Sequence, residues 1–120
     1  MSGSHQKFGS WGETLAARFL EEKGFTILEK NFRAERGEID LICKDENCIV
    51  FVEVKTRRSP AYGPPETSIT PSKQRQLYKI AQAYIATHPS ENMDYRFDVV
   101  VIDGTPQHYE IRYYPDAFML

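Results

Sequence analysis

The sequence has little of what would place it among secreted, membrane or strongly basic proteins. Only two of its 120 residues are cysteine, too few for a disulfide-stapled domain, and they lack metal-site spacing. No apolar run approaches the roughly 20 residues of a membrane-spanning helix, and no basic-then-apolar signal pattern opens the chain. The formal net charge of −2 carries no global nucleic-acid signal. We therefore expect a cytoplasmic protein without a membrane partner.

What is present suits one globular domain. Apolar residues make up 41% and charged residues 27% of the chain, which are ordinary proportions for a soluble protein of this length. We expect a single domain over residues 1–120, with residues 1–9 mobile because they are polar and contain glycine and serine. Cys43 and Cys48 are expected to be reduced and partly buried.

The most informative stretch runs from Gly37 to Arg57 and reads as two strands joined by a polar turn at residues 45–47. In the first strand, alternation places Ile39, Leu41 and Cys43 on one side and Glu38, Asp40 and Ile42 on the other. The second strand is apolar on both faces until Glu53, which suggests a central strand. Glu53 and Lys55 share a face with Ile49 and Phe51, where core residues would be expected.

The length of the connecting turn decides where Asp40 points. An even connection makes Asp40 face the same way as Glu53 and Lys55, whereas an odd one puts it on the reverse. Under the even alternative, two carboxylates and a lysine meet at one end of the sheet. Residues two apart on a strand are separated by roughly 6.6–6.8 Å, which leaves room for hydrated Mg²⁺ or Mn²⁺ between the acids.

A helix is predicted over residues 10–23, ended by Gly24. Glu13 lies on the same stripe as Ala16, Ala17 and Leu20 and so points toward the sheet. Residues 10–13 also match a capping box, in which Glu13 would bond to the amide of Ser10. Both roles remain open for Glu13, and they are compatible.

The remaining pattern predicts an α/β fold. A strand over residues 25–32 should form an antiparallel meander with the two central strands. Residues 59–66 hold three prolines and a glycine and form a candidate substrate flap, or an ordinary connection. A helix should start at Thr70-Pro71 and end at His88-Pro89, followed by strands over residues 95–103 and near 108–113. The strand–helix–strand order predicts a parallel pair.

Two chemical interpretations compete for these residues. If Glu13, Asp40 and Glu53 converge with Lys55, the site suits metal-assisted phosphodiester hydrolysis, with the carboxylates holding the ion and the lysine orienting water or stabilising charge. The simpler alternative is an ion pair at the end of a sheet. From Lys55 to Lys79 the segment is basic and could meet phosphates, or form a solvated face; its basic residues include Arg57, Arg58, Lys73 and Arg75.

Several motifs resemble a known nuclease superfamily. The chain looks like the PD-(D/E)XK pattern in three places. These are an acid on the first helix, then Gly37-Glu38-Ile39-Asp40, then Val52-Glu53-Val54-Lys55-Thr56-Arg57. Together with Asn31-Phe32-Arg33 and Arg96-Phe97-Asp98, they are similar to the YraN-like family of uncharacterised bacterial proteins, over nearly the whole chain.

That resemblance implies a restriction-endonuclease-like α-β-β-β-α-β core with a mixed sheet, to which the pattern adds a C-terminal strand. It implies Asp40 and Glu53 as metal ligands for Mg²⁺ or Mn²⁺, Lys55 as the catalytic lysine and Glu13 as the helix acid. Gln74 and Tyr78 have the spacing of a Gln-x-x-x-Tyr element of RecB-like nucleases, although Arg75 replaces its apolar second position.

We therefore expect a metal-dependent endonuclease acting on nucleic acid, DNA rather than RNA, with a branched or damaged substrate favoured because no sequence-reading module is present. The expected phosphate contacts are Arg57, Arg58, Lys73, Gln74 and Arg75. A homodimer could extend this small basic surface. One alternative is a non-catalytic nucleic-acid-binding protein that keeps the fold, and another is an interaction module that uses the proline-rich loop.

Overall fold

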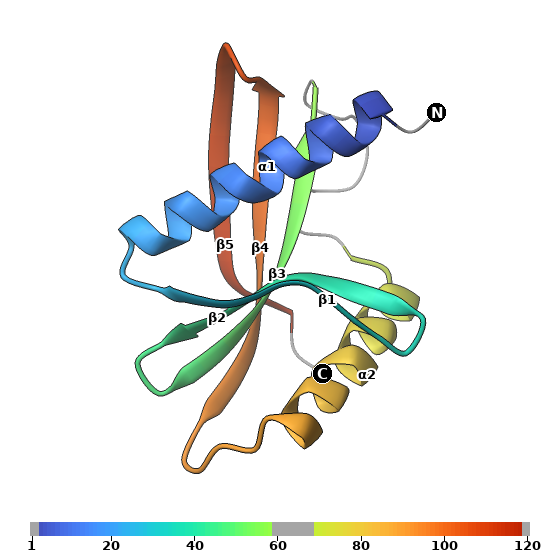
Figure 1. Ribbon diagram of the computed structural model, residues 1–120, viewed down its shortest axis with the longest axis vertical. Helices are drawn as coiled ribbons and strands as arrows, with labels where there is room; N and C mark the ends of the chain where they lie inside the picture. Colours follow the sequence, from blue (N-terminus) through green and yellow to red (C-terminus); the bar gives the residue numbers. More distant parts are fainter. Residues whose placement is uncertain (1–2, 59–68, 119–120) are drawn as a thin grey trace.

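A computed structural model describes residues 3–58 and 69–118, and only the backbone of residues 3–8. The predicted flap at residues 59–66 lies outside the described part. Seven elements follow one another along the chain (Figure 1): α1 Gly3–Glu22, β1 Thr26–Ala34, β2 Gly37–Asp45, β3 Cys48–Arg57, α2 Pro71–Thr87, β4 Asp94–Thr105 and β5 His108–Phe118. This order confirms the predicted α/β class, its α-β-β-β-α-β core and its added C-terminal strand.

The strands form one mixed sheet in the order β1-β2-β3-β4-β5. β3 and β4 run parallel, as predicted for a strand–helix–strand unit, and the other neighbours are antiparallel. β3 is therefore central, which explains why its first half is apolar on both faces.

The two helices cover opposite faces of this sheet. Ala16, Ala17 and Leu20 of α1 pack on Val50 and Val52 of β3. On the reverse face, α2 packs against Ile49 and Phe51 of the same strand. The buried residues of α2 are Leu77, Ile80, Ala81 and Tyr84, the stripe that its sequence predicts. In Figure 1, α1 lies above the β1–β2 hairpin and α2 lies below it.

The ends of α2 were predicted correctly. The Thr70 hydroxyl oxygen accepts a hydrogen bond of 3.1 Å from the amide of Lys73, and Pro71 opens the first turn. His88 caps the other end. Both cysteines are free, also as predicted. Among the described residues, no helix has both the length and the apolar character to span a membrane.

The start of α1 differs from the prediction. The helix begins at Gly3, so residues 3–9 of the segment expected to be mobile are helical. Ser10 lies inside the helix, and the predicted capping box with Glu13 is therefore wrong. The helix continues upstream of Ser10 even though Gly3 and Gly9 are weak helix formers. At the other end, Gly24 follows the helix with a φ of 99°, the left-handed stop that was predicted.

The alternation predicted for the first half of β2 is also wrong. Leu41 and Cys43 pack on the α1 side, but Ile39 packs with α2 beside Ile42. The change of face occurs opposite Asn31 of β1, whose φ of 53° is left-handed and outside the strand region. The β1–β2 hairpin therefore rotates at this point, and the rotation turns Glu38 toward α1.

A close approach fixes α1 on β3. A Cβ atom added at Gly12 would overlap the side chain of Thr56. We predict that Gly12→Ala lowers the free energy of unfolding by about 1–3 kcal/mol, because a β-branched side chain on a central strand cannot easily move aside. Urea denaturation followed by circular dichroism would measure the change.

Gly9→Ala in the same helix is the matched control, since no atom lies within 4 Å of its added Cβ. Its stability should stay the same or rise, because alanine favours the helix. Equal stabilities of the two variants would contradict the close approach.

Candidate functional site

The site forms where β2 and β3 separate. Their pairing runs from Asp45↔Cys48 to Leu41↔Val52, and a two-residue turn, Glu46-Asn47, joins them. The connection is even, so the even alternative is confirmed. Asp40 lies one residue beyond the last pair, at the position that would oppose Glu53. Its Oδ2 atom accepts a hydrogen bond of 2.7 Å from the amide of Val54. The Asp40 carboxylate therefore lies at the fork between the strands.

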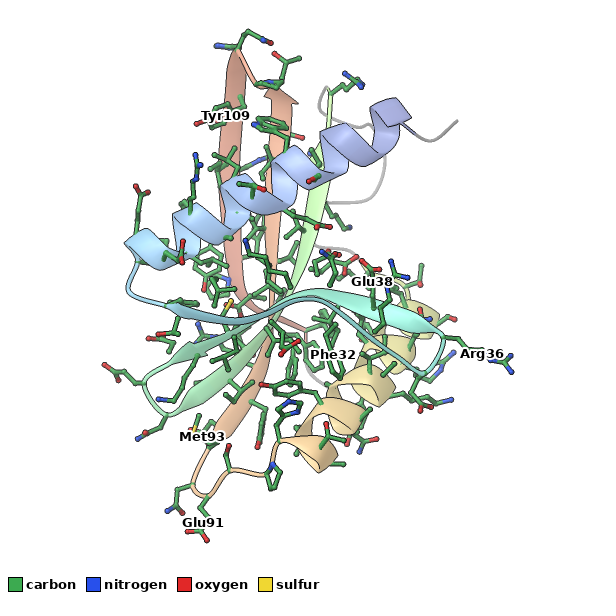
Figure 2. The ribbon with its side chains drawn as sticks, viewed as in Figure 1. Phe32, Arg36, Glu38, Glu91, Met93 and Tyr109 are labelled. Carbon is green, nitrogen blue, oxygen red and sulfur yellow. The ribbon has the colours of Figure 1, made fainter. Side chains whose placement is uncertain are left out.

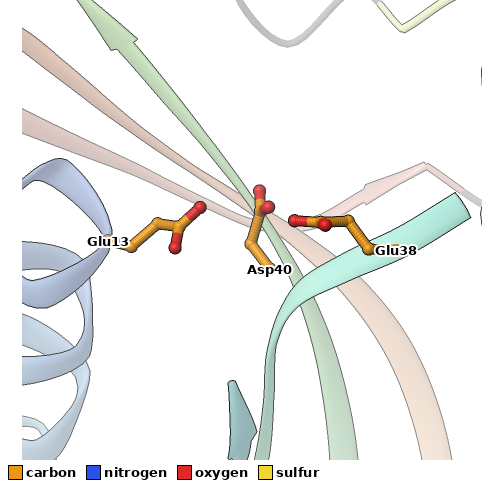
Figure 3. Close-up of side chains that lie close together, drawn as sticks. All are labelled: Glu13, Glu38 and Asp40. Carbon is orange, nitrogen blue, oxygen red and sulfur yellow. The ribbon is translucent and has the colours of Figure 1, made fainter. Parts of the chain in front are cut away.

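Two further acids meet Asp40 there. One carboxylate oxygen from each of Glu13, Glu38 and Asp40 lies within 4.8 Å of the others. Figure 3 shows Glu13 reaching from α1 and Glu38 from β2 toward Asp40, which stands between them. Glu38 was not among the predicted site residues. The Gly-Glu-Ile-Asp motif places it two residues before Asp40, which was the signal available in the sequence.

Asn31 links an acid of α1 to an acid of β2, and it was not among the predicted site residues. With its amide nitrogen facing the carboxylates, Asn31 donates hydrogen bonds of 3.1 Å to Glu13 Oε1 and 3.1 Å to Glu38 Oε2. The opposite orientation would aim its amide oxygen at two other acceptors. Only its position before Phe32-Arg33 marked this residue in the sequence.

Glu53 on β3 is half-buried, and its carboxylate is not one of the three that lie within 4.8 Å of one another. Its negative charge is one of the causes that raise the pKa of Asp40. The positive charges of Lys73 and Lys55 act on Glu53 in the opposite sense, lowering a pKa that burial raises overall. Lys55 therefore lies within electrostatic reach of the site, and Lys73 reaches it from the first turn of α2.

The acids are poorly compensated by the protein itself. Burial, then the charge of Glu53, raises the pKa of Asp40 from 3.8 to about 8, although the bond from Val54 opposes this. Burial also raises the pKa of Glu13, and the bond from Asn31 opposes it. A divalent cation would lower all these values. Several hard carboxylate oxygens within a few ångströms are the donors that Mg²⁺ and Mn²⁺ prefer, so the residues present fit such an ion.

The predicted phosphate contacts occupy different surroundings. Arg57 donates from Nε to Oδ1 of Asp103 at 2.7 Å and from Nη2 to Oδ2 at 3.0 Å, and its side chain is only 19% exposed. This pair lowers the pKa of Asp103 and ties β3 to β4. The geometry gives Arg57 a structural role, and its contact with phosphate stays a prediction.

The other candidates lie on or near α2. Gln74 donates from Nε2 to the carbonyl of Ile69 at 2.8 Å, so its amide already supports the start of the helix. Arg75 is exposed on α2, and Arg58 is exposed just after β3. Lys73, another of the five predicted phosphate contacts, lies close enough for its charge to lower the pKa of Glu53.

Comparison with known proteins places these residues in a family. The model described as "Uncharacterised protein family UPF0102" matches residues 12–102, from the residue before Glu13 to Ile102 in the last third of β4. Proteins named "UPF0102 protein" match over almost their full lengths. One from Geobacter metallireducens is 45% identical over 120 residues, covering 100% of this chain and 98% of its own. One from Clostridium botulinum strain Loch Maree is 44% identical over 119 residues, covering 97% of each.

The raised pKa of Asp40 makes stability depend on pH. In the folded protein this carboxyl titrates near pH 8, and in the unfolded chain near its ordinary 3.8. Between these values the folded state binds more protons, so the free energy of unfolding should fall as pH rises from about 4 to about 8. In Asp40→Asn the fall should be smaller, because the amide cannot ionise.

Urea denaturation at pH 5 and pH 8 without divalent ions would measure both slopes. Asp94→Asn, which alters an exposed acid at the far end of β4, should keep the wild-type slope. An unchanged slope in Asp40→Asn would show that this residue does not carry the effect.

Proposed function

The chain belongs to the uncharacterised protein family UPF0102, and we propose that it is a metal-dependent endonuclease that hydrolyses phosphodiester bonds in DNA. One observation carries the proposal: carboxylates from α1 and β2 gather within 4.8 Å of one another, beside Glu53 and within electrostatic reach of Lys55. These residues match the positions of a PD-(D/E)XK site. A structural ion pair alone would not account for three carboxylates so close together, because such a group lowers stability unless a cation is bound.

Asp40 and Glu53 are the proposed metal ligands, joined by Glu13 and Glu38. Bound Mg²⁺ or Mn²⁺ would polarise the scissile phosphate and make water a stronger nucleophile at neutral pH. Asp40 is held in position by the Val54 amide, and the amide of Asn31 holds Glu13 and Glu38. Lys55 is proposed to orient the attacking water or to stabilise the negative charge that develops on the phosphate.

The proposed substrate is defined by structure more than by base sequence. The sequence contains no recognisable module that would read base edges, and a branched or damaged DNA offers a shape that a small domain can recognise. Lys73, at the start of α2, is a proposed phosphate contact, because its charge acts on Glu53. The proposed compartment is the cytoplasm.

Metal titration tests the donor set directly. We predict that wild-type protein binds Mn²⁺ in isothermal titration calorimetry, and that Asp40→Ala and Glu38→Ala lose most of this binding. Glu110→Ala, which removes an exposed acid on β5, should bind like wild type. Circular dichroism would verify that each variant is folded. Wild-type affinity in Asp40→Ala would contradict the proposed site.

Cleavage of a panel of linear, flapped and four-way DNAs with Mg²⁺ or Mn²⁺ tests the activity. We predict that Lys55→Ala lowers the cleavage rate roughly 100-fold or more, because a positioned charge that stabilises the transition state has effects of this size. Lys44→Ala, exposed near the opposite end of β2, should cut like wild type. DNA binding without cleavage by the wild type would support the non-catalytic binder instead, and equal cutting by Lys55→Ala would point to another site.

A further inference from the structure

The turn between β1 and β2 carries backbone strain. Its two residues, Glu35 and Arg36, have φ values of 50° and 61°, and Ala34 pairs with Gly37 across it. Two-residue turns of this kind strongly favour asparagine and glycine, because other residues are strained in the left-handed conformation. Here the chain keeps two large charged residues instead. Strain that persists in this way is concentrated at ligand-binding positions, which points to the side chains at the tip as candidate ligand contacts.

The hairpin that carries this turn is docked firmly on α2. Phe32 and Ala34 pack against the buried cluster of the helix. A Cβ atom added at Gly37 would come within 2.6 Å of Gln76 Nε2 and 3.0 Å of Ile80 Cδ1, so the backbone itself lies directly on α2. Figure 2 shows Phe32 turned toward α2 and Arg36 projecting outward from the tip. The tip is therefore presented to solvent on a fixed support.

Arg33 lies on the other face of the hairpin from Phe32, beside the acidic site. It pairs in register with Glu38, and its Nε atom is 3.6 Å from Glu38 Oε1. The Arg33 side chain is 81% exposed, so this ion pair is weak and solvated. The Arg33 guanidinium group can therefore leave Glu38 for another anion at little cost in free energy.

A surface hollow on the hairpin extends from the tip to Glu38. It has a volume of about 500 Å³ and is lined by the hairpin residues Arg33, Ala34, Glu35, Arg36, Gly37 and Glu38. Glu38 also belongs to the acidic group. A polyanionic strand with one phosphate at the acids would therefore continue across this hollow. Arg36 lies two strand positions from Glu38, or roughly 7 Å along the backbone.

From these observations we propose that the tip of the β1–β2 hairpin is a binding surface for the nucleic-acid backbone, with Arg33 and Arg36 contacting phosphates next to the one held at the acidic site. This inference rests on the proposed function for the nature of the ligand, but it does not require cleavage. Guanidinium groups match phosphate geometry with two parallel hydrogen bonds. Neither arginine was singled out by the sequence for this role.

The charge balance of the hairpin adds a second property. Glu35 and Glu38 offset Arg33 and Arg36 in the ion-free protein, so the tip has no net charge of its own. A cation bound by Glu38 would neutralise the negative charge of that side chain. Arg33, which pairs with Glu38, would then be able to bind the phosphate instead. Divalent ions should therefore strengthen nucleic-acid binding through the hairpin, a coupling that must hold in both directions.

Fluorescence anisotropy with a labelled four-way DNA junction and a labelled single strand would test this surface in the full chain, with Ca²⁺ or no divalent ion, over a range of salt concentrations. The double variant Arg33→Ala/Arg36→Ala should bind about tenfold more weakly in Ca²⁺. The slope of log K against log salt should fall by about one for each phosphate that the variant no longer neutralises. Arg18→Ala, which removes an exposed arginine of α1, should leave both values at the wild-type level.

A pair of glycine variants separates binding from folding. Arg36→Gly and Glu35→Gly each relieve one left-handed residue of the same turn, so each should raise the melting temperature. Arg36→Gly should nevertheless bind the DNA more weakly, whereas Glu35→Gly should bind as well as or better than wild type. A purely structural turn would give two variants with the same affinity.

The outcomes distinguish this inference from the proposed function. Wild-type affinity and salt slope in the double variant, with metal binding and cleavage intact, would overturn the hairpin surface alone. Weakened binding in a protein that does not cleave would support the hairpin surface while refuting the nuclease. Failure of the wild type to bind either DNA in any condition would overturn both.

Discussion

The candidate site depends on one constraint: several carboxylates share a partly buried fork between two strands. Asp40 reaches this fork one residue past its last strand pair and is held by the amide of Val54 at 2.7 Å. Glu13 and Glu38 close on it to within 4.8 Å. Like charges brought together in a low-dielectric setting repel, so their proximity costs free energy in the ion-free protein. A bound cation would offset that cost, so the proposed metal site would link stability to the proposed chemistry.

The rest of the fold can be understood as support for that arrangement. Gly12 lets α1 approach β3 closely, which brings Glu13 to the sheet. Asn31 takes a left-handed conformation that rotates the hairpin, and its amide bonds the acids of α1 and β2 together. The same rotation turns Arg33 and Glu38 to the face that bears the site. The positioning of the acids therefore depends on backbone geometry in β1 as much as on the residues that carry the charge.

Much of this could be predicted from the sequence, and the exceptions have physical causes. Strand alternation, the Thr70-Pro71 start and the central apolar strand indicate the element order, and the helix stripe places Glu13 toward the sheet. The direction of Asp40 could not be chosen beforehand, because one residue more or less in the turn reverses it. Glu38 was missed although strand alternation already placed it on the same side as Asp40, because the nuclease motif assigns a role to Asp40 alone. The engagement of Arg57 by Asp103 joins residues 46 apart, a pairing that local pattern cannot reveal.

The most direct measurement is a carbon-13 NMR titration of the Asp40 side-chain carboxyl, first without divalent ions and then with Mg²⁺. We predict a pKa near 8 in the ion-free protein and a marked fall when Mg²⁺ is added, because the ion favours the charged form. A pKa near the ordinary value of aspartate that does not change with Mg²⁺ would contradict the convergence of these acids around a cation.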